Sequence, residues 1–465
     1  MKRIRLTLAA RILIASAAIC ALYLIASYRG IIPDGDDPFF PGDMIENADK
    51  PLDLRIGFTD INQVASIVAA NGGLATKADS SISRRGVACA LTLFKDEQDA
   101  ESAFLAGTVN ALATTPARFA ASYHSLEEKS PAVFLLTGNS TIDCAIISRK
   151  PLSGSSALKG KSVICAERGE SHIFGLFLAE CAKLKTGEID WKFTNSDEET
   201  AQLFREGKGD IAIIDFTKIK SSGDLPSPVI RSAEFAGLFR SVLIIREGLV
   251  AIHEHAISSF IDGIFEARTR VAQMKIPDAA ALYSGLGIRN PLFDKNNPAS
   301  LSAGYRDNAD YFRITADRRW DFCREFELIR ALDGSDLPVA DEIVNTIPLG
   351  SVTTQTSPKV STYELPHNGE SFVLFESGIS FSENGSVTDA SRFALKSAAF
   401  LAAMSPSSSI IIGIGKNDSS YTASVRDQSV RNMLTKEYNA PAKIISSSKE
   451  NKQTVIVQLV PQGGK

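Results

Sequence analysis

The stretch that decides the fold is LKGKSVICAERGESHIFGLFLAECAKL, residues 158–184. It divides into a turn at residues 159–161, a short apolar strand at residues 162–166, a polar loop at residues 168–171 and a helix that begins at Ser171. A strand, a small polar loop and a helix start leave backbone N–H groups and the positive end of the helix dipole exposed. We expect this loop to face a cleft that binds an anionic or strongly polar small molecule. The alternative is an ordinary βα connection that binds nothing.

The segments that follow keep a recognisable order. A strand is predicted at residues 189–193 and a helix at residues 196–206, and EGKGDIAIID occupies residues 206–215. The order LKGK, strand, glycine, helix, helix, EGKGDIAIID resembles the second lobe of type 2 periplasmic solute-binding proteins. The similar branch contains the nitrate, sulfonate and taurine substrate-binding proteins of ABC transporters. The resemblance extends from Leu52 to about Arg270, and more weakly to Pro348.

This resemblance implies a two-lobed α/β fold over residues 51–348. The first lobe would combine residues 51–136 and 236–348, and the second lobe would be residues 137–235. It also implies a receptor that captures a small solute and delivers it to an ABC-transporter permease.

Length and composition agree with a globular, multidomain chain. The 465 residues are 44% hydrophobic and 22% charged, enough for about three domains with real cores. The net charge is −4, and no block of Lys and Arg interleaved with aromatic residues occurs, so no nucleic-acid partner is predicted.

The first 30 residues predict a signal anchor. Basic residues precede an uncharged apolar run at residues 12–28, and acidic residues follow it. This asymmetry predicts a cytoplasmic N-terminus in the inner membrane, with the bulk of the protein on the periplasmic face. A cleaved signal peptide is the alternative, and it also gives a periplasmic protein. Residues 31–50, rich in Pro and Asp, read as a linker.

The cysteines and histidines predict no metal and no cofactor. No CxxC pair occurs, and His253 and His255 are spaced so that their rings point apart at a helix start. We expect buried thiols, with a Cys144–Cys165 bridge between neighbouring strands as the alternative.

The first lobe predicts strands alternating with helices, which gives a mainly parallel sheet. Strands are expected at residues 54–58, 87–94 and 109–115, and helices at residues 63–71 and 97–106. Ligands of such sheets bind beyond the carboxyl ends of the strands. Thr59, Asp60, Thr114 and Thr115 follow two of these ends and are candidate ligand-binding residues. The alternative is that they only cap the next helix.

The predicted second lobe supplies the other candidates. Ser140 and Thr141 lie in the loop 137–143, which resembles the S-x-G-A-D crossing loop of the family; Ile142 and Cys144 depart from its small residues. Gly169, Ser171 and His172 come from the central stretch. Asp215 ends the strand 211–215 and could bind an amine or cap a helix. Together with Asp60, it would suit a zwitterion.

Residues 349–370 are rich in Ser, Thr and Pro and predict a second linker. Four segments of residues 371–465 resemble the OmpA-like peptidoglycan-associating domain: VLFESGISFSENG (373–385), IIIGIGKND (410–418), SVRDQSVRNML (424–434) and KENKQTVIVQLV (449–460). The resemblance implies that Asp418 and Arg426 hold the diaminopimelate of a peptide stem. Asn417 replaces the family's Thr, and the loop before Arg426 is shorter than usual. If Gly413 is the motif glycine, Lys416 takes the place of the Asp.

The sequence therefore predicts a membrane-anchored periplasmic solute-binding receptor with a C-terminal module that contacts peptidoglycan or has lost that function. The alternative is an envelope scaffold with a non-binding cleft. The chain has no G-x-S-x-G, Walker or HExxH pattern, so no enzyme is predicted.

Overall fold

The computed structural model divides the chain into two compact units, residues 1–49 and 50–465. The structure describes residues 52–73, 80–139, 142–216, 218–219, 225–235, 238–275, 303–312, 342–352, 367–405, 407–415, 420–438, 440–450 and 452–461, with isolated positions between 277 and 339. The predicted anchor and first linker lie outside these residues. Across the described ranges, no helix combines the length and apolar character needed to cross a bilayer.

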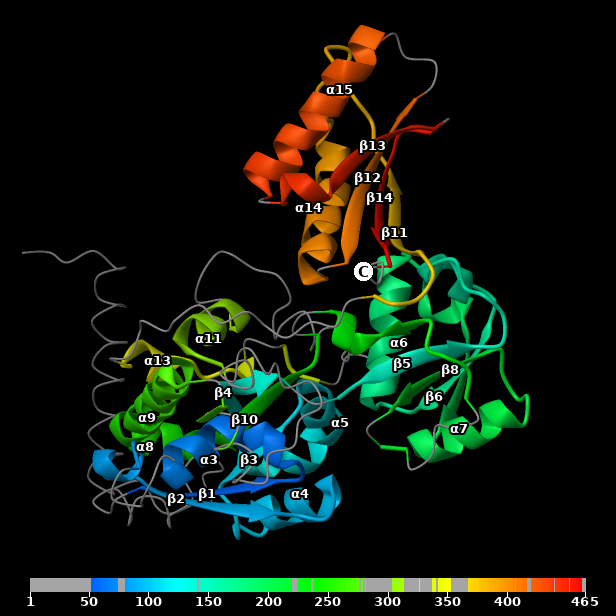
Figure 1. Ribbon diagram of the computed structural model, residues 1–465. Helices are drawn as coiled ribbons and strands as arrows, with labels where there is room; N and C mark the ends of the chain where they lie inside the picture. Colours follow the sequence, from blue (N-terminus) through cyan, green and yellow to red (C-terminus); the bar gives the residue numbers. More distant parts are fainter. Residues whose placement is uncertain are drawn as a thin grey trace, which may run out of the picture. The chain divides into compact units, whose positions relative to one another are not determined.

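The first lobe is built on a five-stranded sheet in the order β2-β1-β3-β10-β4 (Figure 1). Its strands are β1 (Asp53–Phe58), β2 (Ala88–Leu93), β3 (Ala111–Thr114), β4 (Pro131–Asn139) and β10 (Arg240–Arg246). β1 pairs in parallel with β2 and β3, whereas β10 runs antiparallel to β3 and β4. The interior strand β10 is buried at five successive positions, as expected for a strand covered on both faces.

The helices of this lobe are α3 (Ala65–Val68), α4 (Glu97–Leu105), α5 (Pro116–Leu126), α8 (Glu247–Ile252), α9 (Glu254–Gln273), α11 (Tyr305–Tyr311) and α13 (Ile347–Gly350). The helix predicted at residues 63–71 is instead a 3-10 turn (Ile61–Val64), the short α3 and a π turn (Ala69–Gly73). The chain starts to turn earlier than predicted because Asp60 caps residue Asn62. Residues 279–302 and 313–341 lie largely outside the described residues.

The second lobe has its own five-stranded sheet, in the order β7-β6-β8-β5-β9. The strands are β5 (Cys144–Ser148), β6 (Ser162–Ala166), β7 (Asp190–Thr194), β8 (Ile211–Asp215) and β9 (Ile230–Arg231), with helices α6 (Glu170–Cys181) and α7 (Asp197–Arg205). β6 is parallel to β7 and β8, and β5 is antiparallel to β8 and β9.

The Cys144–Cys165 bridge considered above does not form. Both thiols are free, because β8 lies between β5 and β6 and the two strands are not neighbours. Cys89 and Cys181 are free as well, and burial raises the pKa of each of these four thiols.

The C-terminal module is a four-stranded sheet in the order β11-β14-β12-β13, with two helices (Figure 1). Its elements are β11 (Phe372–Gly378), α14 (Asp389–Met404), β12 (Ser408–Gly415), α15 (Ser420–Asn432), β13 (Ile445–Glu450) and β14 (Thr454–Leu459). The described residues thus form a mixed α/β protein, which confirms the α/β part of the predicted fold class; the OmpA-like domain and the N-terminal transmembrane helix stay predictions.

Candidate functional site

The N-terminus of α6 is the centre of the candidate site. β6 ends at Ala166, and Arg168 turns the chain with a left-handed φ of 56°. The helix begins at Glu170, one residue before the predicted start, and its N-cap Gly169 supplies no side-chain cap. Ser171 is 1% exposed, and its Oγ has no hydrogen-bond partner among the described residues. This helix end therefore keeps polar groups that its own backbone does not satisfy.

A hydrogen bond joins this helix end to the first lobe. Thr115 Oγ1 donates to Glu170 Oε1 at 3.0 Å. Thr115 is the N-cap of α5, and the same hydroxyl accepts from Arg118 N at 3.1 Å. Two helix N-termini from different lobes thus meet at the Glu170 carboxylate, which is favoured by the positive end of each helix dipole.

Lys218 adds a positive charge from the second lobe. Its Nζ lies 2.9 Å from Glu170 Oε2 and 3.8 Å from Asp215 Oδ2. Asp215, at the end of β8, is 1% exposed, and its backbone N–H donates to Asp197 Oδ1 at 2.9 Å. The site therefore places three buried carboxylates, those of Glu170, Asp197 and Asp215, around one ammonium group.

The charges of this cluster shift its pKa values in opposite directions. Burial raises the pKa of Asp197 to about 6, with Asp215 and Glu170 acting in the same direction. Burial also opposes ionisation of Glu170, but the charge and hydrogen bond of Lys218 outweigh it, so the pKa of Glu170 is lowered. Glu170 raises the pKa of Lys218 in return. At neutral pH the ion pair between Lys218 and Glu170 is formed.

His172 faces aromatic side chains of β7. Its ring centroid lies 4.9 Å from that of Trp191 and 4.6 Å from that of Phe193, and its Nδ1 accepts from Arg168 N at 3.4 Å. Burial, assisted by Arg168, lowers the pKa of His172 to about 4. The neutral ring is packed against Trp191 and Phe193, so its surroundings are those of a core residue.

The candidates that follow β1 and β3 lie in the first lobe. Asp60 Oδ1 accepts from Asn62 N at 2.9 Å, and Gln63 Oε1 accepts from the backbone of Thr59 and Asp60 at 3.3 Å, which is the capping role given above as the alternative. Thr114, on β3, is half-buried beside Thr115. Ser140 and Thr141 lie outside the described residues.

Of the predicted residues, the structure thus brings Thr115, Gly169, Ser171 and Asp215 close to Glu170. Asp60 instead caps the 3-10 turn that follows β1. Sequence reasoning missed Glu170, Lys218 and Asp197. Glu170 and Asp197 each look like an ordinary first-turn acid of a helix, and Lys218 looks like an i,i+3 partner of Asp215. No local pattern indicates that they converge.

In the C-terminal module, the predicted wall-contacting Arg426 lies on α15. Its guanidinium carbon is 5.1 Å from the centroid of the Phe381 ring, a cation–π geometry. Asp418 lies outside the described residues.

No protein-family model matches the sequence, and no curated protein matches it. Solved structures do show similarity. The periplasmic aliphatic sulphonate-binding protein SsuA of Escherichia coli is 15% identical, with a TM-score of 0.40, over 52% of this chain and 81% of that chain. The alkanesulfonate-binding SsuA of Xanthomonas axonopodis pv. citri, bound to MOPS, is 13% identical with a TM-score of 0.38, over 54% and 85% of the two chains.

A third similar structure is the ligand-binding component of an ABC-type import system from Staphylococcus aureus, with zinc bound. It is 11% identical with a TM-score of 0.44, over 65% of this chain and 99% of that chain. The first two are thus sulphonate-binding proteins, and the third is the ligand-binding component of an import system.

Proposed function

We propose that this protein is a membrane-anchored periplasmic solute-binding receptor whose two lobes close on a small solute. The observation that carries the proposal is the meeting of the N-termini of α5 and α6 at Thr115 and Glu170. Helix N-termini offer N–H groups and a favourable dipole to a polar ligand. In this proposal an ABC-transporter permease receives the solute.

The proposed ligand is a small anion or, in better agreement with the charges, a zwitterion. Lys218 and the N-terminus of α6 at Ser171 suit a negative group. Asp215 and Asp197 suit an ammonium group, because the described residues bring three buried carboxylates, those of Glu170, Asp197 and Asp215, close to the Lys218 ammonium.

The test is thermal unfolding of the full chain with nitrate, alkanesulfonates, phosphate and amino acids. A ligand at 100 times its Kd adds about 2.7 kcal/mol of stability. Lys218→Met and Ser171→Pro should abolish the shift, the second because proline removes a donor N–H and alters the loop. Lys95→Met, which changes an exposed lysine of the first lobe, is the matched control. Equal shifts in all four proteins would contradict this location of the site.

An envelope scaffold with a non-binding cleft is the second candidate. One observation favours it: the Glu170 carboxylate already occupies the place between the two helix N-termini, and Lys218 neutralises it. Absence of any stabilisation across the solute panel, in a protein that unfolds cooperatively, would support the scaffold over the receptor.

We also propose that residues 371–465 form an OmpA-like, wall-contacting module. The strand order with two helices and the position of Arg426 on α15 support this. Arg426→Ala should reduce retention of the full chain on purified sacculi, whereas Arg392→Ala, which alters a half-exposed arginine of α14, should not. Equal retention of both variants would remove Arg426 from the proposed wall contact.

A further inference from the structure

A buried histidine lies between the second lobe and the C-terminal module. His367 is 0% exposed; its Nδ1 is 2.7 Å from Glu234 Oε2, and its Nε2 is 2.7 Å from the Glu370 carbonyl oxygen. A carboxylate and a carbonyl both accept hydrogen bonds. Only the imidazolium form has an N–H on both ring nitrogens, so only the cation satisfies both contacts.

The partners of His367 belong to two different parts of the fold. Glu234 lies in the 3-10 turn Ser232–Glu234, directly after β9, where the chain leaves the second lobe for β10 of the first. His367 N donates to Ser407 Oγ at 2.8 Å, immediately before β12 of the C-terminal module. One residue therefore links the segment that crosses between the lobes to the module.

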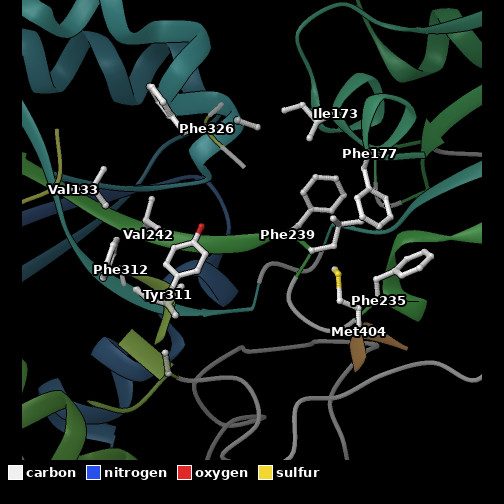
Figure 2. Packing of buried hydrophobic residues seen from close by; sticks show 14 of the residues in the cluster. Val133, Ile173, Phe177, Phe235, Phe239, Val242, Tyr311, Phe312, Phe326 and Met404 are labelled. Carbon is white, nitrogen blue, oxygen red and sulfur yellow. The ribbon is translucent and has the colours of Figure 1, made fainter. Parts of the chain in front are cut away.

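Other contacts surround this link. Val373 N, on β11, donates to Ser153 O of the second lobe at 2.9 Å, and Lys183 Nζ donates to Ser377 Oγ at 2.6 Å. Met404, the last residue of α14, belongs to the same buried cluster as Phe235, beside the crossing segment (Figure 2). The module is therefore packed on the second lobe through both polar and apolar contacts.

We propose that His367 is a proton-operated clamp, which docks the C-terminal module on the crossing segment when its ring is cationic and loosens it when the ring is neutral. Glu234 is the acidic side chain that faces the ring. Its other oxygen accepts from Arg231 N at 2.9 Å, and the Arg231 guanidinium is paired with Asp143. These bonds hold Glu234 in place as an acceptor.

The direction of the pH effect follows from the surroundings. Burial by itself would lower the pKa of His367, but the hydrogen bonds to Glu234 and to the Glu370 carbonyl, with the charge of Glu234, raise it. The stabilisation is therefore complete below the ordinary histidine pKa of about 6.5 and is lost as pH rises through the folded-state value. At acidic pH the C-terminal module would therefore move together with the second lobe, and at alkaline pH the two would be coupled less strongly.

The test is hydrogen exchange of the Val373 amide in the full chain between pH 5.5 and 9, expressed as protection relative to the unfolded chain. Wild type should lose protection by roughly fivefold or more across this range. His367→Gln and Glu234→Gln should show the lower protection at every pH. The matched control His124→Gln, at an exposed histidine of α5, should behave as wild type.

A second measurement stands even if His367→Gln fails to fold. In the wild-type chain, nitrogen NMR of the His367 ring should show N–H groups on both nitrogens at pH 6 and titration at higher pH. A neutral ring at pH 6, or Val373 protection that does not change with pH, would overturn the clamp.

Discussion

Thr115 and Glu170 lie in different lobes, 55 residues apart in the chain, and share a 3.0 Å hydrogen bond. Each residue stands at the start of a helix, and the Glu170 carboxylate also pairs with Lys218. A negative charge here is favoured by two helix dipoles and a cation. The Glu170 carboxylate therefore holds the junction of the two lobes. A ligand that bound between the two helix N-termini would have to replace the contacts of this carboxylate with Thr115 or Lys218.

Replacing Glu170 tests this junction. Glu170→Gln should lower the free energy of unfolding at pH 7 by about 1–3 kcal/mol, because Lys218 loses its nearest carboxylate. The loss should shrink as pH falls below about 4.5. Folding lowers the pKa of Glu170, so its carboxylate stabilises the folded state fully above the unfolded-state pKa, and this stabilisation is lost as pH falls through the folded-state pKa. Urea unfolding at pH 7 and pH 4 measures both. Glu167→Gln, an exposed acid of the same loop, should change little; an equal loss there would contradict the prediction.

Asp197 should have the opposite pH dependence. Its folded pKa is raised to about 6, so ionisation costs stability as pH rises from about 4 to 6. Asp197→Asn keeps the acceptor for Asp215 N and removes the charge. It should raise the free energy of unfolding at pH 7–8 by roughly 2 kcal/mol and leave it unchanged below pH 4. A gain that does not depend on pH would refute this assignment.

His172 should remain neutral down to acidic pH. Because its folded pKa is lowered to about 4, the stability that depends on the neutral ring is complete above about pH 6.5 and is lost as pH falls toward 4. His172→Phe, which keeps the ring contacts with Trp191 and Phe193, should flatten this acid-side loss. Unfolding measured at intervals from pH 4 to 7 checks it, and an unchanged slope would show that His172 is not responsible.

The packing of α6 on its sheet depends on a glycine. A Cβ at Gly175 would lie 2.6 Å from Ile213 Cδ1 and 2.7 Å from Trp191 Cη2, both too close. Gly175→Ala should therefore destabilise the second lobe by about 1–3 kcal/mol from overpacking, although the helix propensity of alanine offsets up to about 1 kcal/mol. Gly187→Ala, at a position with open space, should lie close to wild type in the same denaturation experiment. Similar losses in both variants would argue against this steric reason.

Local patterns predicted the second lobe well. The strand at residues 162–166 coincides with β6, and α6 begins one residue from its expected start, because the apolar run and the Gly169 loop are decided by neighbours in the chain. The helix after Asp60 was predicted as regular and is not, since the Asp60 and Gln63 cap tightens its first turn into a 3-10 helix.

The sequence by itself determined the α/β character of this protein, the alternation of strands and helices, and the polar loop at Gly169. These features depend on residues close together in the chain, whose hydrophobic period and capping groups act locally. Only the tertiary structure decided which polar and charged groups meet: Thr115 with Glu170, Glu170 with Lys218, and Glu234 with His367, the last pair 133 residues apart. Those pairings follow from strand order and burial, because a charge is costly to bury unless folding brings it a partner from a distant segment.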